Sequence, residues 1–303
     1  MRYKKDISII MPCYNAQKYI HESIKSVLNQ SFSDFEFIIV NDGSIDYTKE
    51  IALSYNDKRI IYHERKINSG NYFARNLGLS ISNGKYICMI DADDVCSINR
   101  LEKQFDIMQR KKWIDCLGSQ SEVIDELGDT IGSIGRPLTS ESIKISLLKN
   151  NCMTQSTLMF RKSSLDKYGL FYDEKYRYSG DYDLMVKLSR WGKLQNLQEN
   201  LIKYRMHLNQ ISQTKRKEQI SLANGVRLSQ LDYIGMSCSQ NEKKLFLKWM
   251  NGLPVTKEEL VLLESLFNKL LVANHQKKFY NQNYLYRFLN RELHLILYQG
   301  KFY

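Results

Sequence analysis

A cluster of carboxylates directly follows an apolar segment of this chain. In YICMIDADDV, residues 86–95, a run suited to burial ends in Asp91, Asp93 and Asp94. Such negative charge at the end of a buried strand is unfavourable unless positive charge lies nearby. Paired carboxylates suit a hard divalent cation, which takes oxygen ligands and commonly shares itself with substrate phosphates. A solvated acidic turn capping a helix that starts near Ser97 would use the same residues, so both interpretations stay open.

The elements that must position these carboxylates alternate between two types. Short β-rich runs are separated by helical patterns over about 16–30, 46–55 and 72–81. Strands alternating with amphipathic helices favour a parallel sheet with helices packed on its faces. Ligands bind such sheets at the carboxyl ends of the strands. We therefore expect one ligand site to be lined by the polar residues after each strand: PCYN at 12–15, NDGS at 41–44, NSGN at 68–71 and DADD at 91–94.

The second half of the chain is patterned differently. A less regular region at about 126–153 precedes STLMFRK and LIKYRMHLNQIS, which predict strands, and GDYDLMVKLSRWG, which predicts a helix entered from a loop. From about Lys215 the pattern is helical, with no internal repeat and no low-complexity linker. A docked helical appendage is therefore expected rather than a tethered domain.

Composition limits the class of protein. An apolar content of 43% with 25% charged residues is ordinary for a soluble globular chain. The six cysteines are widely spaced, without zinc-ligand spacing, which fits a reduced cytosolic compartment. The apolar run ISIIM near the N-terminus is too short for a secretory signal, and no stretch approaches the roughly 20 apolar residues of a membrane span.

Positive charge is concentrated in the C-terminal part. Residues 1–213 hold 30 Lys and Arg against 26 Asp and Glu, whereas residues 214–303 hold 14 against 7. With interleaved aromatics, as in KKFYNQNYLYRFLNREL, the basic tail suits the anionic inner face of a membrane. A helical cap with a solvated basic face explains the same residues equally well. No nucleic-acid-binding motif accompanies the charge, so we expect no nucleic-acid partner.

Six ordered motifs over about residues 6–213 resemble the family 2 glycosyltransferases of the bacterial polysaccharide type. They are ISIIMPCYNAQKYIHESIKSVLNQSF, FEFIIVNDGSIDYT, SGNYFARNLGL, YICMIDADD, SGDYDLMVKLSRWG and YRMHLNQIS. The resemblance implies the glycosyltransferase-A fold, an α/β fold with a mostly parallel central sheet flanked by helices. It also implies a catalytic domain at 1–213 and a basic helical C-terminal extension at 214–303.

The resemblance implies a set of nucleotide-binding residues. Pro12 and Tyr14 would line the nucleotide pocket, although simple core packing would also account for Tyr14. Asp42 would accept a hydrogen bond from a uracil imide, whereas its place before a glycine also suits a turn. Arg75 would help to hold the nucleotide end of the donor, unless it lies on a solvated helix face. Asp91 would contact the ribose or support the metal.

The resemblance also implies a metal site and a catalytic base. Asp93 is the expected direct ligand of Mn²⁺ or Mg²⁺, with Asp91 and His207 beside it, although a lone histidine is more often structural. Asp181 is the expected general base, which takes the proton of the attacking hydroxyl. Its alternative role is that of a helix N-cap.

Two further residues bear on this base. Asp183 would point to another face of the helix and suits a purely structural role. The residue before the base, usually Glu in the family, is Gly180 here, which leaves the acceptor pocket undefined.

The implied enzyme is an inverting glycosyltransferase. It would transfer a hexosyl or N-acetylhexosaminyl group from a nucleotide diphosphate donor, expected to be UDP-linked, to a hydroxyl of a glycan or lipid-linked glycan. We expect it in the cytoplasm, at the inner membrane face if the tail binds there. A non-catalytic protein that retains the fold and binds the nucleotide-sugar is the alternative.

The sequence lacks the motifs of two other classes of nucleotide-binding enzyme. A nicotinamide dehydrogenase needs GxGxxG after the first strand, and a sugar nucleotidyltransferase needs a glycine-rich, arginine-containing loop there. MPCYNAQ contains neither.

Overall fold

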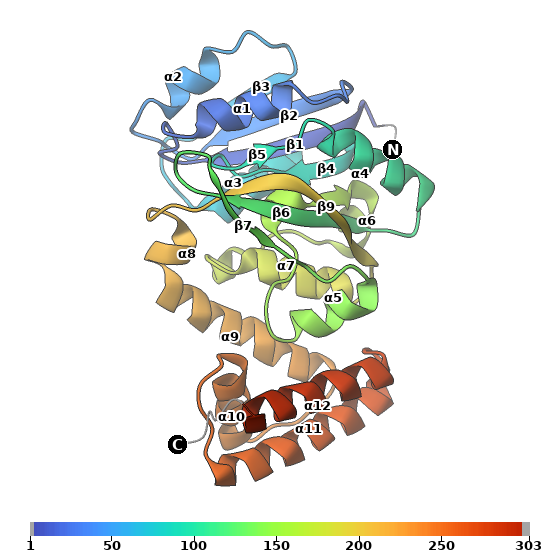
Figure 1. The fold of residues 1–303 in the computed structure, drawn as a ribbon. Coiled ribbons are helices and arrows are strands. Elements are labelled where there is room, and N and C mark those ends of the chain that lie inside the picture. Colours follow the sequence, from blue (N-terminus) through green and yellow to red (C-terminus); the bar gives the residue numbers. More distant parts are fainter. Residues whose placement is uncertain (1–2, 299–303) are drawn as a thin grey trace.

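The computed structural model describes residues 3–298, which form a sheet lobe and a lobe of C-terminal helices (Figure 1). Half of the central sheet consists of parallel strands in the spatial order β3-β2-β1-β4. Their bounds are β1 (Lys5–Cys13), β2 (Phe35–Asn41), β3 (Ile60–Glu64) and β4 (Gly84–Met89). Because all four run in the same direction, the segments that follow them meet at one edge of the sheet. The predicted strands of this half are confirmed.

The other half of the sheet is mixed. It continues from β4 in the order β8-β6-β9-β5, with β7 paired to β6. The strands are β5 (Val95–Cys96), β6 (Cys116–Ile124), β7 (Thr130–Ile134), β8 (Met159–Arg161) and β9 (Leu194–Arg205). Strand β9 runs parallel to β6, whereas β5, β7 and β8 pair antiparallel with their neighbours.

The region at 126–153 is more regular than its sequence suggests. It contains β7 and helix α5 (Ser140–Leu147). Four of the five residues of β7 are exposed, so the strand carries no alternation between buried and exposed positions. The sequence pattern missed this edge strand because periodicity is informative only where one face is buried.

Helices cover both faces of the sheet. One face is packed by α1 (Ile20–Leu28), α2 (Thr48–Leu53) and α4 (Arg100–Arg110). The opposite face is packed by α3 (Asn71–Ile81), α5, α6 (Lys162–Tyr168) and α7 (Gly180–Ser189). Two short 3₁₀ helices, η1 (Gln155–Thr157) and η2 (Glu174–Tyr176), complete this part of the chain.

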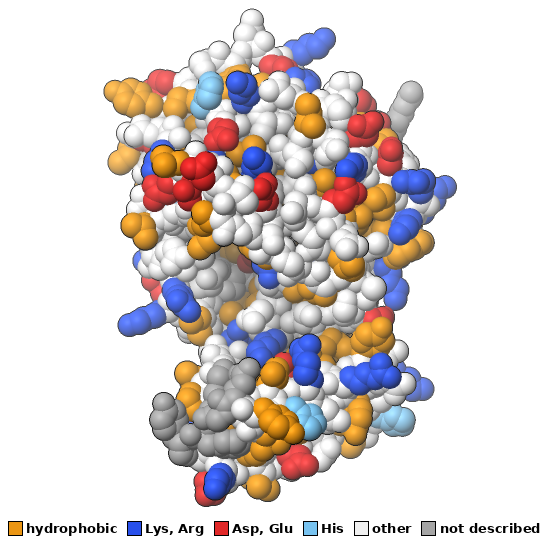
Figure 2. Space-filling model, in the orientation of Figure 1, with side chains coloured by type: hydrophobic (Ala, Val, Ile, Leu, Met, Phe, Trp, Pro, Cys, Tyr) orange, Lys and Arg blue, Asp and Glu red, His pale blue; other side chains and the backbone are white. Residues whose placement is uncertain are grey.

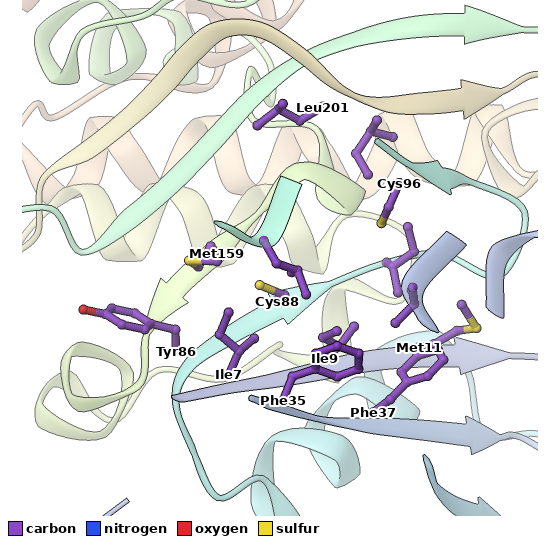
Figure 3. Packing of buried hydrophobic residues seen from close by; sticks show 14 of the residues in the cluster. Ile7, Ile9, Met11, Phe35, Phe37, Tyr86, Cys88, Cys96, Met159 and Leu201 are labelled. Atoms are coloured by element: carbon purple, nitrogen blue, oxygen red, sulfur yellow. The ribbon is translucent and has the colours of Figure 1, made fainter. Parts of the chain in front are cut away.

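The core explains why the strands read as continuous apolar runs. Along β1, Ile7, Ile9 and Met11 point into the first core, whereas Ile10 points into the second. Successive side chains of a strand alternate between the two faces, and both faces are covered here. Figure 3 shows the first core, where Phe35 and other residues of neighbouring strands pack against those of β1.

The C-terminal part is helical, as predicted. Its helices are α8 (Ile211–Thr214), α9 (Arg216–Tyr233), α10 (Gln240–Met250), α11 (Lys257–Lys277) and α12 (Gln282–Tyr298). Helices α9 to α12 share a third core with Ile145 and Leu148 of the α5 region. Lys149 also forms an ion pair of 2.5 Å with Glu292 of α12. The division at 213/214 stays a prediction, because Val226 of α9 packs into the core of the sheet lobe.

Within residues 3–298, no helix has both the length and the apolarity needed to cross a bilayer. All six cysteines are free, and five of them are buried.

Candidate functional site

The segments after β1 and β2 form a joined pair of loops. The Ser44 hydroxyl accepts from the backbone N–H of Asn15 at 2.9 Å, and the Asn15 side-chain oxygen accepts from the N–H of Ile45 at 3.0 Å. Pro12 is buried in β1. The side chain of Tyr14 is 47% exposed, so the alternative of core packing is wrong for this residue. An exposed aromatic ring at this edge is free to contact a flat ligand.

Asp42, directly after β2, is almost wholly buried and is held by three donors. Its carboxylate accepts from Arg65 Nη1 at 2.9 Å and from the backbone N–H groups of Ser69 and Gly70 at 3.0 and 2.7 Å. Gly70 has φ +102°, a conformation that glycine adopts without strain. Asp42 therefore shapes the loop that enters α3, in addition to any contact with the uracil of a nucleotide. Arg65 carries no local sequence signal that marks this role.

Arg75 is buried rather than solvated. Its side chain is 5% exposed and forms an ion pair with Asp91, whose side chain is 30% exposed. The alternative of a solvated helix face is therefore wrong. The guanidinium also lies near the rings of Tyr72 and Tyr172, with its carbon 5.4 and 5.7 Å from the ring centres. Helix α3 thus brings positive charge to the acidic loop after β4.

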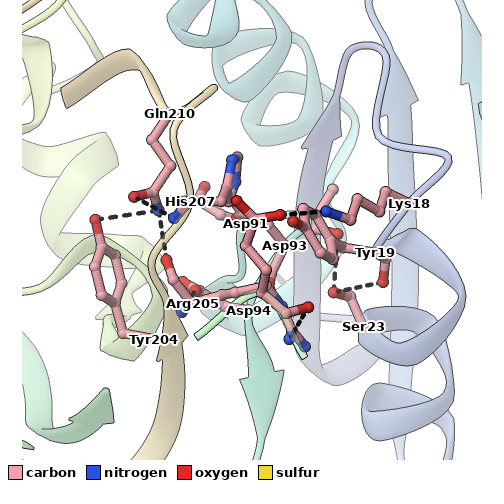
Figure 4. Close-up of polar contacts among 12 residues, drawn as sticks. Lys18, Tyr19, Ser23, Asp91, Asp93, Asp94, Tyr204, Arg205, His207 and Gln210 are labelled. Carbon is pink, nitrogen blue, oxygen red and sulfur yellow. Dashed lines mark hydrogen bonds and ion pairs between the residues drawn. The ribbon is translucent and has the colours of Figure 1, made fainter. Parts of the chain in front are cut away.

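The three carboxylates of that loop have three different environments (Figure 4). Asp91 pairs with Arg75, while Asp93 lies 3.0 Å from Nε2 of His207. Asp94 is 1% exposed and accepts from the backbone N–H of Arg205 at 2.9 Å. Burial, reinforced by the neighbouring carboxylates, raises the pKa of Asp94 well above its usual range. Each acidic side chain of the loop therefore has a different partner: Arg75 for Asp91, His207 for Asp93, and the backbone N–H of Arg205 for Asp94.

Arg205 at the end of β9 fixes this loop from the opposite side. Its side chain is 1% exposed, donates through Nε to the carbonyl oxygen of Asp93 at 3.0 Å, and pairs with Glu22 of α1. It also donates to the carbonyl oxygen of Asp125 at 3.1 Å. Sequence reasoning missed Arg205, since only packing brings β9 beside a loop more than a hundred residues earlier.

The side chains at this loop are suitable ligands for a divalent cation. The Asp93 side chain is 27% exposed and has the His207 imidazole beside it, so one oxygen and one nitrogen ligand lie together. Within residues 3–298, no three His, Cys, Asp or Glu side chains converge as a ready-made metal centre. Mg²⁺ and Mn²⁺ commonly use one or two protein ligands and complete their shell with substrate oxygens and water. Asp91, the third predicted ligand, is engaged by Arg75.

Asp181 lies on the first turn of α7. Its Oδ1 accepts from the hydroxyl of Tyr72 at 2.8 Å, and its Oδ2 accepts from Nδ2 of Asn151 at 2.9 Å. The N-cap of α7 is Ser179, so Asp181 is not the capping residue. Each carboxylate oxygen can accept a second hydrogen bond, which leaves capacity for a substrate hydroxyl. Sequence reasoning missed Tyr72 and Asn151.

Two charged residues near α7 complete this region. Asp183 is buried and pairs with Lys187 at 2.6 Å, which agrees with its expected structural role. Arg136 is half-buried, donates to the hydroxyl of Thr154 at 3.1 Å, and lies within electrostatic reach of Asp181. Burial lowers the pKa of Arg136. Within the described residues Arg136 has no carboxylate partner at ion-pair distance, so its guanidinium is available to an anionic group.

Parallel strands ending in an acidic loop, with a separate carboxylate on a helix across from it, are the arrangement of a glycosyltransferase with the glycosyltransferase-A fold. Comparison with known proteins identifies the family. Residues 8–169 match the model of glycosyl transferase family 2. The chain belongs to this family.

Similar proteins from other organisms are also described as glycosyltransferases. An uncharacterized glycosyltransferase of Haemophilus influenzae is 34% identical over 239 residues, which cover 75% of this chain and 73% of that protein. One of Methanocaldococcus jannaschii is 36% identical over 223 residues, covering 71% and 76%.

Solved structures share the fold. TarS 1-349 of S. aureus in complex with UDP-GlcNAc superposes with a TM-score of 0.65 at 18% identity, covering 89% of this chain and 83% of that one. The same protein in complex with UDP gives a TM-score of 0.60 at 18% identity, covering 96% and 89%. At this identity the likeness concerns the fold.

Proposed function

We propose that this protein is an inverting glycosyltransferase that transfers a hexosyl or N-acetylhexosaminyl group from a UDP-sugar to a hydroxyl of a glycan or lipid-linked glycan. The observation that carries the proposal is the fixed carboxylate of Asp181, held at both oxygens by Tyr72 and Asn151. A group held in this way is oriented before substrate binds, which general base catalysis requires. The UDP-GlcNAc and UDP complexes of TarS support a UDP-linked donor.

The reaction follows from the roles of the residues. The acceptor hydroxyl gives its proton to Asp181 while its oxygen attacks the anomeric carbon. The bond between that carbon and the diphosphate oxygen breaks, and UDP leaves with the bonding electron pair. Because one displacement occurs and no covalent enzyme intermediate forms, the anomeric configuration inverts.

Donor binding is assigned to the carboxyl edge of the parallel half-sheet. Pro12, Tyr14 and Asp42 would surround the nucleotide, with Asp42 oriented by Arg65. Arg75 would help to hold the nucleotide end of the donor, and Asp91, its ion-pair partner, would contact the ribose or support the metal. Asp93 and His207 would hold Mn²⁺ or Mg²⁺, which supplies positive charge to the departing diphosphate.

A panel of UDP-sugars with Mn²⁺ tests this proposal. At least one sugar should support UDP release, and Asp181→Asn should reduce the rate by about a hundred- to ten-thousand-fold. Asp166→Asn, which removes an exposed carboxylate on α6, is the matched control and should retain the rate. NMR of the product should show inverted stereochemistry, and retention would exclude single displacement. UDP binding without release from any sugar would establish the non-catalytic alternative instead.

We also propose that the C-terminal helices contact an anionic membrane surface, where a lipid-linked acceptor would lie. Tyr284, Arg287, Arg291 and Tyr298 are exposed on α12 at spacings that repeat along one helix face. Figure 2 shows Lys and Arg side chains gathered at the upper edge of this helical lobe. Aromatic and basic side chains on one face are typical of helices that lie on anionic lipid.

Vesicle sedimentation tests the membrane contact in the full chain. Vesicles with anionic phosphatidylglycerol should retain the protein more strongly than vesicles of phosphatidylcholine alone. Arg287→Glu with Arg291→Glu should abolish the difference. Lys58→Glu with Lys66→Glu, which reverses two exposed charges on the sheet lobe, should preserve it. Equal losses in both double variants would show only non-specific charge attraction.

A further inference from the structure

The backbone at Gly180 approaches an aromatic ring too closely for any side chain. A Cβ atom added at Gly180 would lie 2.8 Å from Cδ2 and Cε2 of Tyr72. Real Cβ contacts are essentially never this short, and a buried ring attached to α3 cannot move aside freely. The family pattern has Glu at this position, whereas here the ring of Tyr72 occupies the space that a side chain would need.

The same tyrosine contacts the proposed base. Its hydroxyl donates to Oδ1 of Asp181 at 2.8 Å, and its ring stacks on that of Tyr172, with ring centres 5.4 Å apart and planes 7° from parallel. The Tyr72 side chain is therefore held by Gly180, by Tyr172 and by its hydrogen bond. Burial, together with the charge of Asp181, raises the pKa of Tyr72 well above its usual range, so its hydroxyl remains a donor.

We propose that Tyr72, beside Asn151, is a positioning residue of Asp181, and that Gly180 and Tyr72 are a matched pair in which the aromatic ring replaces the side chain usual at position 180. The inference rests on the proposed function, in which Asp181 is the general base. In this arrangement the loss of Glu at 180 does not disable the site, because another element restrains the base. The hydroxyl of Tyr72 fixes the carboxylate, and the glycine makes room for the ring.

The first test removes only the hydroxyl. Tyr72→Phe should lower kcat for UDP release about tenfold while changing KM for the UDP-sugar less than about twofold, because the base is misplaced and the donor site is intact. Tyr172→Phe is the matched control, since it removes a buried hydroxyl from the stacked partner ring, which bonds to Gln155 rather than Asp181. Equal kcat values for the two variants would overturn the inference.

NMR detects the contact between Tyr72 and Asp181 in the absence of substrate. In protein labelled with ¹³C at aspartate carboxyl groups, Asp181→Asn assigns the Asp181 resonance. Tyr72→Phe should shift this resonance, and Tyr172→Phe should leave it in place. An unchanged resonance in Tyr72→Phe would also overturn the inference.

The matched pair is tested by a double-mutant cycle. Gly180→Ala should lower kcat about tenfold in the natural background, because the added methyl group displaces the ring. In a Tyr72→Leu background the same change should cost less than about twofold, since the ring is absent. Equal factors in both backgrounds would show independent sites and overturn the pairing.

The role of Asp181 as general base and the role of Tyr72 in positioning it can be contradicted independently. If Asp181→Asn releases UDP at the natural rate, the assignment of the base is wrong. If Asp181→Asn is inactive while Tyr72→Phe matches the natural protein, only the positioning role is wrong.

Discussion

Arg75 of helix α3 and Asp91 of the acidic loop form an ion pair that joins the two segments on which donor binding is proposed to depend. The guanidinium of Arg75 is almost fully buried, and the carboxylate of Asp91 is mostly buried. Removing one member of a buried pair leaves the other charge uncompensated, which is more costly than the pair itself is stabilising. The relationship therefore has consequences for stability as well as for binding.

Asp91→Ala should lower the free energy of unfolding by about 3 kcal/mol, because Arg75 then keeps its burial without a counter-charge. Asp93→Ala is the matched control in the same loop. It should change the free energy by less than about 1 kcal/mol, since Asp93 is partly exposed and its removal reduces carboxylate repulsion. Urea denaturation of the two variants measures the difference. Equal destabilisation would contradict the structural role of the pair.

Arg65→Met should destabilise the protein by about 2 kcal/mol, because it leaves the buried carboxylate of Asp42 with only backbone donors. It should also weaken UDP binding, since Asp42 holds the loop at Ser69 and Gly70. Calorimetric titration with UDP measures the second effect. Lys66→Met, at the exposed neighbouring position, is the control and should behave as the natural protein.

UDP with Mn²⁺ should raise the melting temperature by at least about 2 °C, because a ligand that binds only the folded state stabilises it by an amount that grows with the logarithm of the ratio of ligand concentration to Kd. Asp93→Asn should remove the manganese-dependent part of this shift and leave the effect of UDP alone unchanged. Asp106→Asn, an exposed carboxylate on α4, should retain the full response. A full response in Asp93→Asn would contradict its assignment as a metal ligand.

Asp57 provides a pH-dependent contribution to stability. Its hydrogen bonds to Arg59 lower the pKa of this carboxyl to about 2. A lowered pKa means that the ionised form stabilises the fold above about pH 4, and that this stabilisation is lost as pH falls through 2.

Asp57→Asn should therefore cost about 1 kcal/mol at pH 7, a value reduced for the partial exposure of the pair. The cost should shrink steadily between pH 4 and pH 2. Urea titrations at several pH values would measure it, and a cost that is constant with pH would contradict the assignment.

The local sequence was sufficient to predict the parallel half of the fold. Strands such as β2, buried on both faces, contain runs of consecutive apolar residues, such as 37–40, and helices such as α3 carry their own periodic stripe. Both patterns involve residues that are close in sequence, so they predict these strands and helices without knowledge of the rest of the chain. The position of Asp42 and of the acidic loop at strand ends followed from the same patterns.

The sequence by itself determined the strands and helices of the parallel half-sheet, the helical character of the C-terminal part, and which polar residues follow the parallel strands. Only the tertiary structure decided the partners of those residues: Arg65 for Asp42, Arg205 for the acidic loop, and Tyr72 for Asp181. These contacts join residues between 23 and 111 positions apart in the chain. No short-range periodicity encodes such a pairing, because it depends on how the packed helices and sheet bring distant side chains within hydrogen-bond distance.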